Sequence, residues 1–415
     1  MINKYKNYLV TFGTEMIIMV LGFLVFRIAN QHFDEYGFSE YSILRRTVSF
    51  LLPLTMIGLG VSIPRYISLE PNRNSYFFSG LIWIVISSTL LMLILSLGRG
   101  FFSKIFFGSN EYSTFIMPIG LLLLAYGLHA IIYGFLRGKL NVFLANFIQF
   151  INIGVIPLAV LYFSNSVLNL IYLNAFLLLA SCLIVIGIVF KKYDIPINKV
   201  LIKEDSLTLL KYGLPRVLGD FSLLAILTLP TYIALEMQTD ILVGGDVAYS
   251  ITLLNLVGAA FSPISLVLLP EIASFINQKR SDLIEKRFKV FVVICLALTT
   301  VGYLVFYFFT NFFLHLLLGG NYRLELIAYS RIVLLGSFGY GLYIILRSFL
   351  DAIHVKATNA YNLLICLGIF LIFVYVGHLN EYSISYFLYS FVFCLCVLGI
   401  ITFFQTYFNI KKIKW

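Results

Sequence analysis

Seven charged residues fall inside stretches of this chain that are otherwise long and apolar enough to cross a bilayer. A charge at the centre of a membrane helix costs about 2.5–3.5 kcal/mol, so seven facing lipid would cost about 20 kcal/mol. That exceeds the roughly 5–15 kcal/mol that keeps a typical protein folded. The side chains must therefore face a wet interior, pair with one another or lie near headgroups. They are Arg27, Arg45, Arg46, Arg216, Arg331, Glu15 and Asp220.

Arginine outnumbers the acids in this set, which favours an anionic cargo, since guanidinium forms bidentate contacts with phosphate oxygens. Arg216 and Asp220 are four residues apart on one predicted helix face. We expect Arg216 to bind an anion and Glu15 or Asp220 to exchange H⁺ or Na⁺. Because Asp220 lies one turn from Arg216, it is the better candidate for an ion-pair partner, and Glu15 for the titrating group. The alternative is an ion pair that only neutralises buried charge.

Arg27, Arg45 and Arg46 lie toward the outer ends of the first two predicted spans and are expected to form an upper cationic patch. The alternative is that they extend toward outer headgroups, as long side chains do easily. At most one of the adjacent Arg45 and Arg46 can point squarely into a cavity. Arg331 is interpreted in the same way, so all five arginines are candidates for substrate binding.

No catalytic residue, metal site or cofactor is predicted. The five cysteines have neither metal-ligand spacing nor an arguable disulfide pairing, and are interpreted as small buried apolar residues. GFLRGKL at 134–140 is one residue too short for a P-loop and follows a membrane helix rather than a strand. Transport powered by ATP on this chain is therefore not expected.

The elements that position these residues are membrane helices. Hydrophobic residues make up 60% of the 415 and charged residues 12%, against about 25% charged in soluble domains. The apolar runs continue for 20 residues or more without alternation, which excludes a β-barrel. The sequence therefore predicts an all-α polytopic membrane protein with about twelve spans, at 8–31, 41–64, 76–98, 112–136, 142–163, 167–190, 207–235, 247–273, 288–310, 324–346, 357–377 and 383–408.

The distribution of lysine and arginine predicts the orientation of these spans. With the N-terminus inside, twenty-one of the 29 fall in cytoplasmic segments and three in outer segments, and the other five lie within spans. This is a strong positive-inside bias and favours cytoplasmic location of both termini. The net charge of +10 is explained by contact with anionic headgroups and indicates no nucleic-acid partner.

Local matches between the halves predict a duplication. YSI at 41–43 recurs at 249–251, Pro64 matches Pro270, GSN at 108–110 matches GGN at 319–321, and LR at 136–137 recurs at 346–347. The offsets are all roughly 206–211 residues. A shift of six spans keeps the membrane orientation, so we expect two parallel six-helix lobes, 1–195 and 207–415, joined by a cytoplasmic linker at 196–206. Transporters built from such repeats bind substrate between the halves.

Several segments resemble the O-antigen flippase (Wzx-type) branch of the multidrug/oligosaccharidyl-lipid/polysaccharide exporter superfamily. They are EYGFSEYSILRRTVSFLLPLTMIGLGVSIPRYIS at 35–68, KYGLPRVLGDF at 211–221, LLGGNY at 317–322 and the LRG and LRS helix ends. The resemblance implies a V-shaped alternating-access transporter in the bacterial inner membrane. The implied substrate is an undecaprenyl-diphosphate-linked oligosaccharide, flipped to the periplasmic leaflet. The implied partners are the lipid bilayer, the O-antigen polymerase and the chain-length regulator.

Three other functions remain alternatives. A multidrug or cation antiporter shares this fold, but its cationic substrates call for an acidic or aromatic lumen. A lipid II flippase typically has two further spans, for which this chain has no room. An O-antigen polymerase or ligase would be a membrane enzyme with a long periplasmic loop, whereas the longest polar stretch here, 191–205, is predicted to be cytoplasmic.

Overall fold

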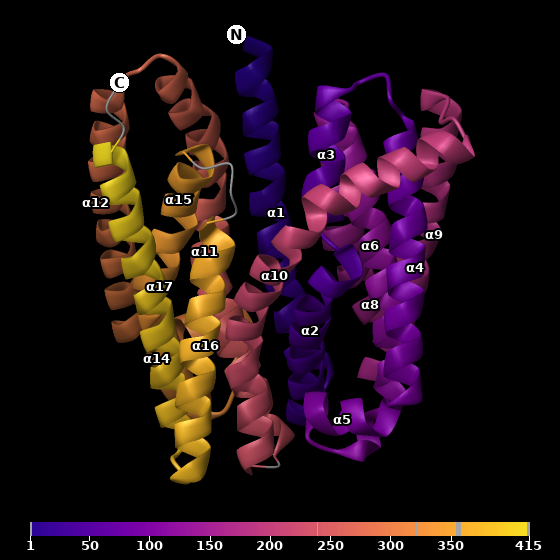
Figure 1. The fold of residues 1–415 in the computed structure, drawn as a ribbon. Coiled ribbons are helices and arrows are strands. Elements are labelled where there is room, and N and C mark those ends of the chain that lie inside the picture. Colours follow the sequence, from indigo (N-terminus) through magenta and orange to yellow (C-terminus); the bar gives the residue numbers. More distant parts are fainter. Residues whose placement is uncertain (1, 239, 321, 354–357, 413–415) are drawn as a thin grey trace. The chain divides into compact units, whose positions relative to one another are not determined.

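A computed structural model describes residues 2–238, 240–320, 322–353 and 358–412, and every regular element in these ranges is helical (Figure 1). The predicted Asn321 match and the predicted lobe ends, residues 1 and 413–415, lie outside these ranges. The helices are α1 (Ile2–His32), α2 (Glu35–Met56), α3 (Leu59–Leu69), α4 (Ser75–Leu97), α5 (Arg99–Phe107), η1 (Asn110–Phe115), α6 (Ile116–Gly138), α7 (Val142–Gln149), η2 (Phe150–Val155), α8 (Ile156–Phe163), α9 (Val167–Tyr193), α10 (Lys199–Gln238), α11 (Ile241–Asn277), α12 (Ser281–Phe308), α13 (Thr310–Leu318), α14 (Leu324–Leu335), α15 (Ser337–Ile353), α16 (Thr358–Leu379) and α17 (Ile384–Lys412).

The spans predicted from apolar windows correspond to these helices in order. Among the described residues, ten helices are long and apolar enough to cross a membrane. Two bent pairs, α2 with α3 and α14 with α15, raise the number to twelve if each is one span. The predicted all-α polytopic class is therefore confirmed.

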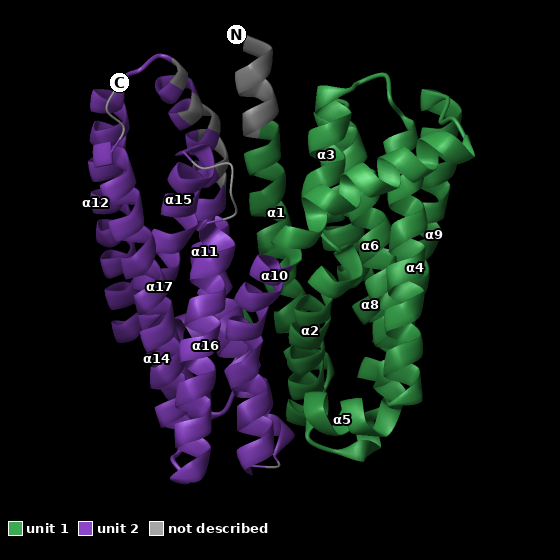
Figure 2. Cartoon of the chain, viewed as in Figure 1, with its two compact units in different colours: residues 1–217, 317–319 green, residues 218–316, 320–415 purple. Residues whose placement is uncertain are grey.

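Two compact units make up the chain, residues 1–217 with 317–319 and residues 218–316 with 320–415 (Figure 2). Within the first unit, α6 packs against α2, α3, α4 and α9. Within the second, α15 packs against α11, α12 and α17. In each unit, then, the fourth span is the central helix and contacts the second, third and sixth, as expected for six-helix repeats.

The boundary between the units differs from the predicted linker. Helix α10 begins at Lys199 and continues to Gln238, so most of 196–206 is helical. The division falls inside this helix, after Val217. The polar residues of 199–206 that suggested a linker instead form the first turns of a long helix.

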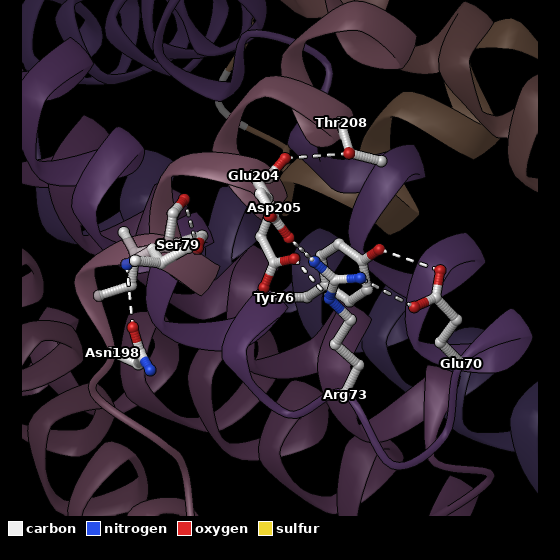
Figure 3. A network of polar contacts seen from close by, with 10 residues as sticks. Glu70, Arg73, Tyr76, Ser79, Asn198, Glu204, Asp205 and Thr208 are labelled. Atoms are coloured by element: carbon white, nitrogen blue, oxygen red, sulfur yellow. Dashed lines mark hydrogen bonds and ion pairs between the residues drawn. The ribbon is translucent and has the colours of Figure 1, made fainter.

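A polar cluster fastens the start of α10 to the loop between α3 and α4 (Figure 3). The Asp205 side chain is fully buried, and its Oδ1 lies 2.7 Å from Arg73 Nε. Arg73 also pairs with Glu70 and with the exposed Glu204, and Tyr76 donates a hydrogen bond to Glu70. Burial lowers the pKa of Arg73, but the neighbouring carboxylates, Asp205 first, outweigh it and raise that pKa overall. Residues 199–206 are thus an integral part of the first unit.

The bend between α2 and α3 depends on a glycine. Ile57 ends α2 in the left-handed conformation, and Gly58 follows with φ +78°. A Cβ on Gly58 would lie 2.3 Å from the carbonyl oxygen of Gly213 on α10. Only glycine provides both this backbone conformation and this close approach.

The second unit has its own close backbone contact, between α15 and α17. A Cβ on Gly339 would lie 2.1 Å from the Leu395 carbonyl oxygen, and one on Gly399 would lie 2.6 Å from the Gly339 carbonyl oxygen. Small residues allow helix backbones to meet in this way within membranes. The two helices therefore pack without intervening side chains at this point.

Candidate functional site

A cavity of about 230 Å³ lies inside the first unit, between α2, α6, η2 and α9. Its polar lining comes from Tyr41, Arg45 and Ser49 of α2, Tyr126 of α6 and Asn174 of α9. The remaining walls are aliphatic, and they are Leu44, Val48, Leu52, Leu122, Ile153, Leu170 and Ile171. The cavity therefore combines one cationic side chain and several hydrogen-bonding groups with an apolar surround.

Arg45 is the charged residue of this cavity. Its Nη1 donates to the Tyr41 hydroxyl at 3.3 Å, and its guanidinium lies 5.6 Å from the Phe26 ring centroid and 6.0 Å from that of Tyr41. Within the described residues, no ion pair joins Arg45 to a carboxylate. Aromatic faces and a hydroxyl stabilise the cation only in part. A half-buried cation without an acidic neighbour is suited to bind an anion.

Asn174 supplies a second polar group to the same cavity. Its side chain is 6% exposed, and its Oδ1 has no hydrogen-bond partner among the described residues. An unsatisfied buried acceptor costs about 1–3 kcal/mol, so such atoms usually meet water or a ligand. The cavity therefore offers an acceptor beside the cation, as a hydroxyl-bearing anion would require.

Local sequence shapes two of the cavity walls. Helix α2 begins at the N-cap Asp34, whose carboxylate accepts a hydrogen bond from Gly37 N. Tyr41 and Arg45 follow about two and three turns later, on one face. Element η2 is a π-helix. Pro157 follows it and has no N–H to donate to the Ile153 carbonyl, which favours a local change in helix winding. Such π-segments occur frequently at functional sites.

The structure distinguishes the two adjacent arginines of α2. Arg45 lines the cavity, whereas Arg46 is 4% exposed and lies outside the lining. The expectation that at most one of the pair faces a cavity therefore agrees with this geometry. Arg27 is half-buried on α1, next to Phe26, the residue whose ring packs on Arg45.

Glu15 lies on α1 and contacts α7 of the same unit. Gln149 Nε2 donates to its Oε1 at 3.0 Å. One turn earlier on α1, Thr11 Oγ1 accepts hydrogen bonds from Arg137 Nη1 at 3.0 Å and Asn146 Nδ2 at 3.2 Å. Glu15 is therefore a member of a polar cluster in the first unit.

The predicted ion pair between Arg216 and Asp220 is not among the contacts of Arg216. Its Nη1 donates to the Tyr212 carbonyl at 2.9 Å, and its guanidinium stacks 3.8 Å from the Tyr212 ring centroid. Arg216 belongs to the first unit and the exposed Asp220 to the second, although one helix carries both.

Arg331 of α14 is held by protein groups of the second unit. Its Nε donates to Thr310 Oγ1 at 3.0 Å, and its Nη2 donates to the Tyr307 carbonyl at 3.1 Å. Its guanidinium also lies 4.7 Å from the Tyr307 ring centroid. These contacts satisfy the end of α12 and the start of α13, so they have a structural role.

A sequence model of the family described as polysaccharide biosynthesis protein matches residues 5–276. The chain belongs to this family. No protein of curated function matches the sequence. The predicted superfamily is confirmed, because the family match spans most of the chain and solved exporter structures of that superfamily share the fold.

Three of these solved structures show the extent of the likeness. An inward-facing multidrug resistance MATE family transporter of the MOP superfamily has a TM-score of 0.74 at 13% identity over 98% of each chain. An outward-facing MATE transporter has a TM-score of 0.65 at 14% identity, and the match covers 98% of this chain and 96% of that one. A MOP superfamily transporter from Pyrococcus furiosus, described as having a binding pocket of reverse polarity, has 0.70 at 14% identity, covering 99% and 96%. This polysaccharide biosynthesis family member is therefore a multi-pass membrane protein with the fold of these transporters.

Sequence reasoning missed part of the polar interior of this family member. Tyr126 and Asn174 line the cavity, but each comes from a different span and has no motif around it. Arg137 entered the sequence analysis only through the LR match at 136–137, yet it donates a hydrogen bond to Thr11 and lies 5.5 Å from the Tyr133 ring centroid. A polar residue at every third or fourth position of α6 was the available signal.

Proposed function

We propose that this protein is a flippase that moves an undecaprenyl-diphosphate-linked oligosaccharide, the O-antigen repeat unit, from the cytoplasmic to the periplasmic leaflet. The first and second units are the bodies that alternate, with the lipid tail remaining in the bilayer. Structures of related fold occur in inward-facing and outward-facing conformations, which supports alternating access.

The observation that carries this proposal is Arg45 in its cavity. A diphosphate has about two negative charges and needs a cationic contact inside an apolar protein. Arg45 lies beside hydrogen-bonding groups and has no ion-pair partner among the described residues. Its cavity also has the aliphatic walls that an isoprenoid-linked headgroup would meet. Arg27, Arg46 and Arg216 are further candidates for contacts along the path, whereas Arg331, predicted with them, is held by protein groups of the second unit.

Glu15 is the candidate for ion coupling. Its carboxylate lies in the same unit as Arg45 and is hydrogen-bonded by Gln149. Exchange of H⁺ or Na⁺ at Glu15 would change the charge of the first unit as the substrate binds or leaves. Asp220, exposed on α10, is the second candidate, with a greater part in folding than in coupling.

The location follows from the proposed substrate. We place the protein in the bacterial inner membrane with both termini in the cytoplasm, where lipid-linked precursors are made. The O-antigen polymerase and the chain-length regulator are the proposed partners on the outer side. A binding pocket of reverse polarity in the Pyrococcus furiosus transporter gives a precedent for a changed charge preference within this fold.

The experiment compares Arg45→Ala with Arg45→Lys in cells and in vesicles. Arg45→Ala should abolish surface polysaccharide and the flipping of a lipid-linked oligosaccharide in reconstituted vesicles, while the protein stays inserted. Arg45→Lys should restore part of the activity, because lysine keeps the charge and loses the planar fork. Full activity of inserted Arg45→Ala protein would exclude Arg45 as the substrate contact.

A further inference from the structure

Helix α6 has a stripe of polar residues through the interior of the first unit. Tyr126, His129, Tyr133 and Arg137 follow one another at intervals of three or four residues, so they lie along one helix face. The stripe joins two sites. Tyr126 lines the Arg45 cavity, and Arg137 bonds Thr11, one turn from Glu15.

His129 is the central member of this stripe and the one whose side chain type ordinarily titrates near neutral pH. Its side chain is 7% exposed. Asn152 Nδ2 donates to His129 Nδ1 at 3.0 Å, and Ser181 Oγ donates to Asn152 Oδ1 at 2.7 Å. This arrangement requires neutral imidazole with Nδ1 free to accept.

Proton binding at His129 Nδ1 would reverse this chain of hydrogen bonds. Nδ1 would become a donor, so the Asn152 amide would have to rotate and present its Oδ1. The Asn152 Nδ2 would then face Ser181 Oγ, which can accept. Only hydrogen bonds change, and the one proton that enters stays on the imidazole.

Asn152 lies next in sequence to a residue of the cavity wall. It is fully buried in the π-helix η2, and its neighbour Ile153 is a cavity wall. Ser181 lies on α9, two turns beyond the cavity residue Asn174. The switch therefore connects three of the four elements that form the cavity.

We propose that His129 binds a proton when an anion enters the Arg45 cavity, so that anion binding and proton uptake are coupled within the first unit. This inference rests on the proposed function and names its regulation. A charge on buried His129 is costly while the cavity is empty. An anion in the cavity, whose wall includes Tyr126 one helical turn from His129, would offset that cost through electrostatic attraction. By linkage, the bound proton would strengthen anion binding by the same factor.

The other charged and titratable groups come from the elements packed on α6 and from α1. They are Glu35, Tyr36, Glu40, Tyr41, Arg45 and Arg46 on α2, Arg65 and Tyr66 on α3, Tyr76 on α4, Arg99 and Lys104 on α5, Glu111 and Tyr112 on η1, Tyr172, Cys182, Lys191, Lys192 and Tyr193 on α9, Glu15 on α1, and Tyr126, Tyr133 and Arg137 on α6 itself. The four glutamates ordinarily titrate below pH 7. Glu15 lies one turn from Thr11, which Arg137 of the stripe contacts, so it is the group that the test must separate from His129.

The experiment measures sulfate binding to the purified full-length protein, because the charge of sulfate is constant from about pH 5.5 to about pH 8. Wild-type protein should bind sulfate about tenfold more tightly at the lower pH. Calorimetry in buffers of different ionisation enthalpy should show proton uptake on binding. The control His315→Gln, an exposed position in the second unit, should keep both effects in full, and Glu15→Gln should keep the proton uptake that belongs to His129.

The variants separate the possible outcomes. In His129→Gln, sulfate binding should become independent of pH and take up no proton. Arg45-dependent binding with an unchanged pH profile in His129→Gln would overturn the inference and leave the anion site standing. Wild-type binding without proton uptake, or uptake lost in Glu15→Gln, would overturn it even if His129→Gln fails to fold. Sulfate binding that does not depend on Arg45 would overturn the anion site and the inference together.

Discussion

The two units share one helix plan but differ in what fills their centres. In the first unit, the central helix α6 carries the polar stripe, faces the Arg45 cavity and lies beside the π-helix η2. In the second, the central helix α15 meets α17 backbone to backbone at Gly339 and Gly399. Its arginine neighbour, Arg331, is bound by protein groups. The first unit thus has a cavity beside its central helix, whereas the central helix of the second meets its neighbour backbone to backbone.

This difference assigns separate tasks to the units. Buried polar groups cost stability unless they are satisfied, so a cavity with an unpaired cation is kept where it binds something. Close glycine packing stabilises helices without providing a site. We therefore expect substitutions at the centre of the second unit to affect folding and those at the centre of the first to affect transport.

The largest effect should come from Gly339→Val in the second unit. The new Cβ would meet backbone atoms of Leu395 and Cys396 that cannot move aside, so we expect a loss of about 3 kcal/mol or more and little folded protein. Size-exclusion profiles and thermal melting of detergent-purified protein measure this. The control is Gly368→Val on α16, where a Cβ would meet no atom within 4 Å. Equal loss in both variants would refute the packing argument.

A smaller loss of stability is expected for Asp205→Asn in the first unit. Asp205 is fully buried against Arg73, so removing its charge should cost about 1–3 kcal/mol in the free energy of unfolding. Glu204→Gln is the matched control, because Glu204 pairs with the same arginine but its side chain is 60% exposed. We expect less than about 1 kcal/mol there. Asp205→Asn should therefore have the lower melting temperature of the two variants, and the reverse order would contradict the account.

The Glu15→Gln substitution should leave folding intact and change coupling. Glutamine keeps an oxygen that can accept from Gln149 Nε2, so the contact to α7 survives. Flipping in reconstituted vesicles should slow several-fold and lose the part of its dependence on an imposed pH gradient that comes from Glu15, whereas the part from His129 remains. If gradient-dependent flipping is unchanged, Glu15 has only a structural part in the first unit.

The apolar windows predicted the spans well because hydrophobic length is a property of sequence alone. They did not predict the break at Ile57–Gly58, which comes four residues after Pro53 and requires the approach of Gly213 from a distant helix. Nor did they predict that α10 begins at Lys199, because the partner of the buried Asp205 is Arg73, far away in sequence. Sequence patterns encode local periodicity, whereas these features depend on tertiary contacts.

The candidate site was predictable only in part, for the same reason. The cost of a membrane charge identified Arg45 as a residue that needs a polar environment. It could not decide between Arg45 and Arg46, because that choice depends on how α2 is rotated against α6. The same cost did not separate Arg331 from Arg45, because the hydrogen-bond partners of Arg331, Thr310 and the Tyr307 carbonyl, come close to it only in the folded unit.

The most direct test of this account compares one arginine from each unit in binding a short-chain prenyl diphosphate to purified protein. Arg45→Ala should weaken binding roughly 10- to 100-fold, as expected for loss of a charge-assisted contact, and leave the melting temperature nearly unchanged. Arg331→Ala should lower the melting temperature and change the affinity by less than about threefold. Unchanged affinity in folded Arg45→Ala, or an equal or larger loss of affinity in Arg331→Ala, would contradict the assignment of substrate binding to the first unit.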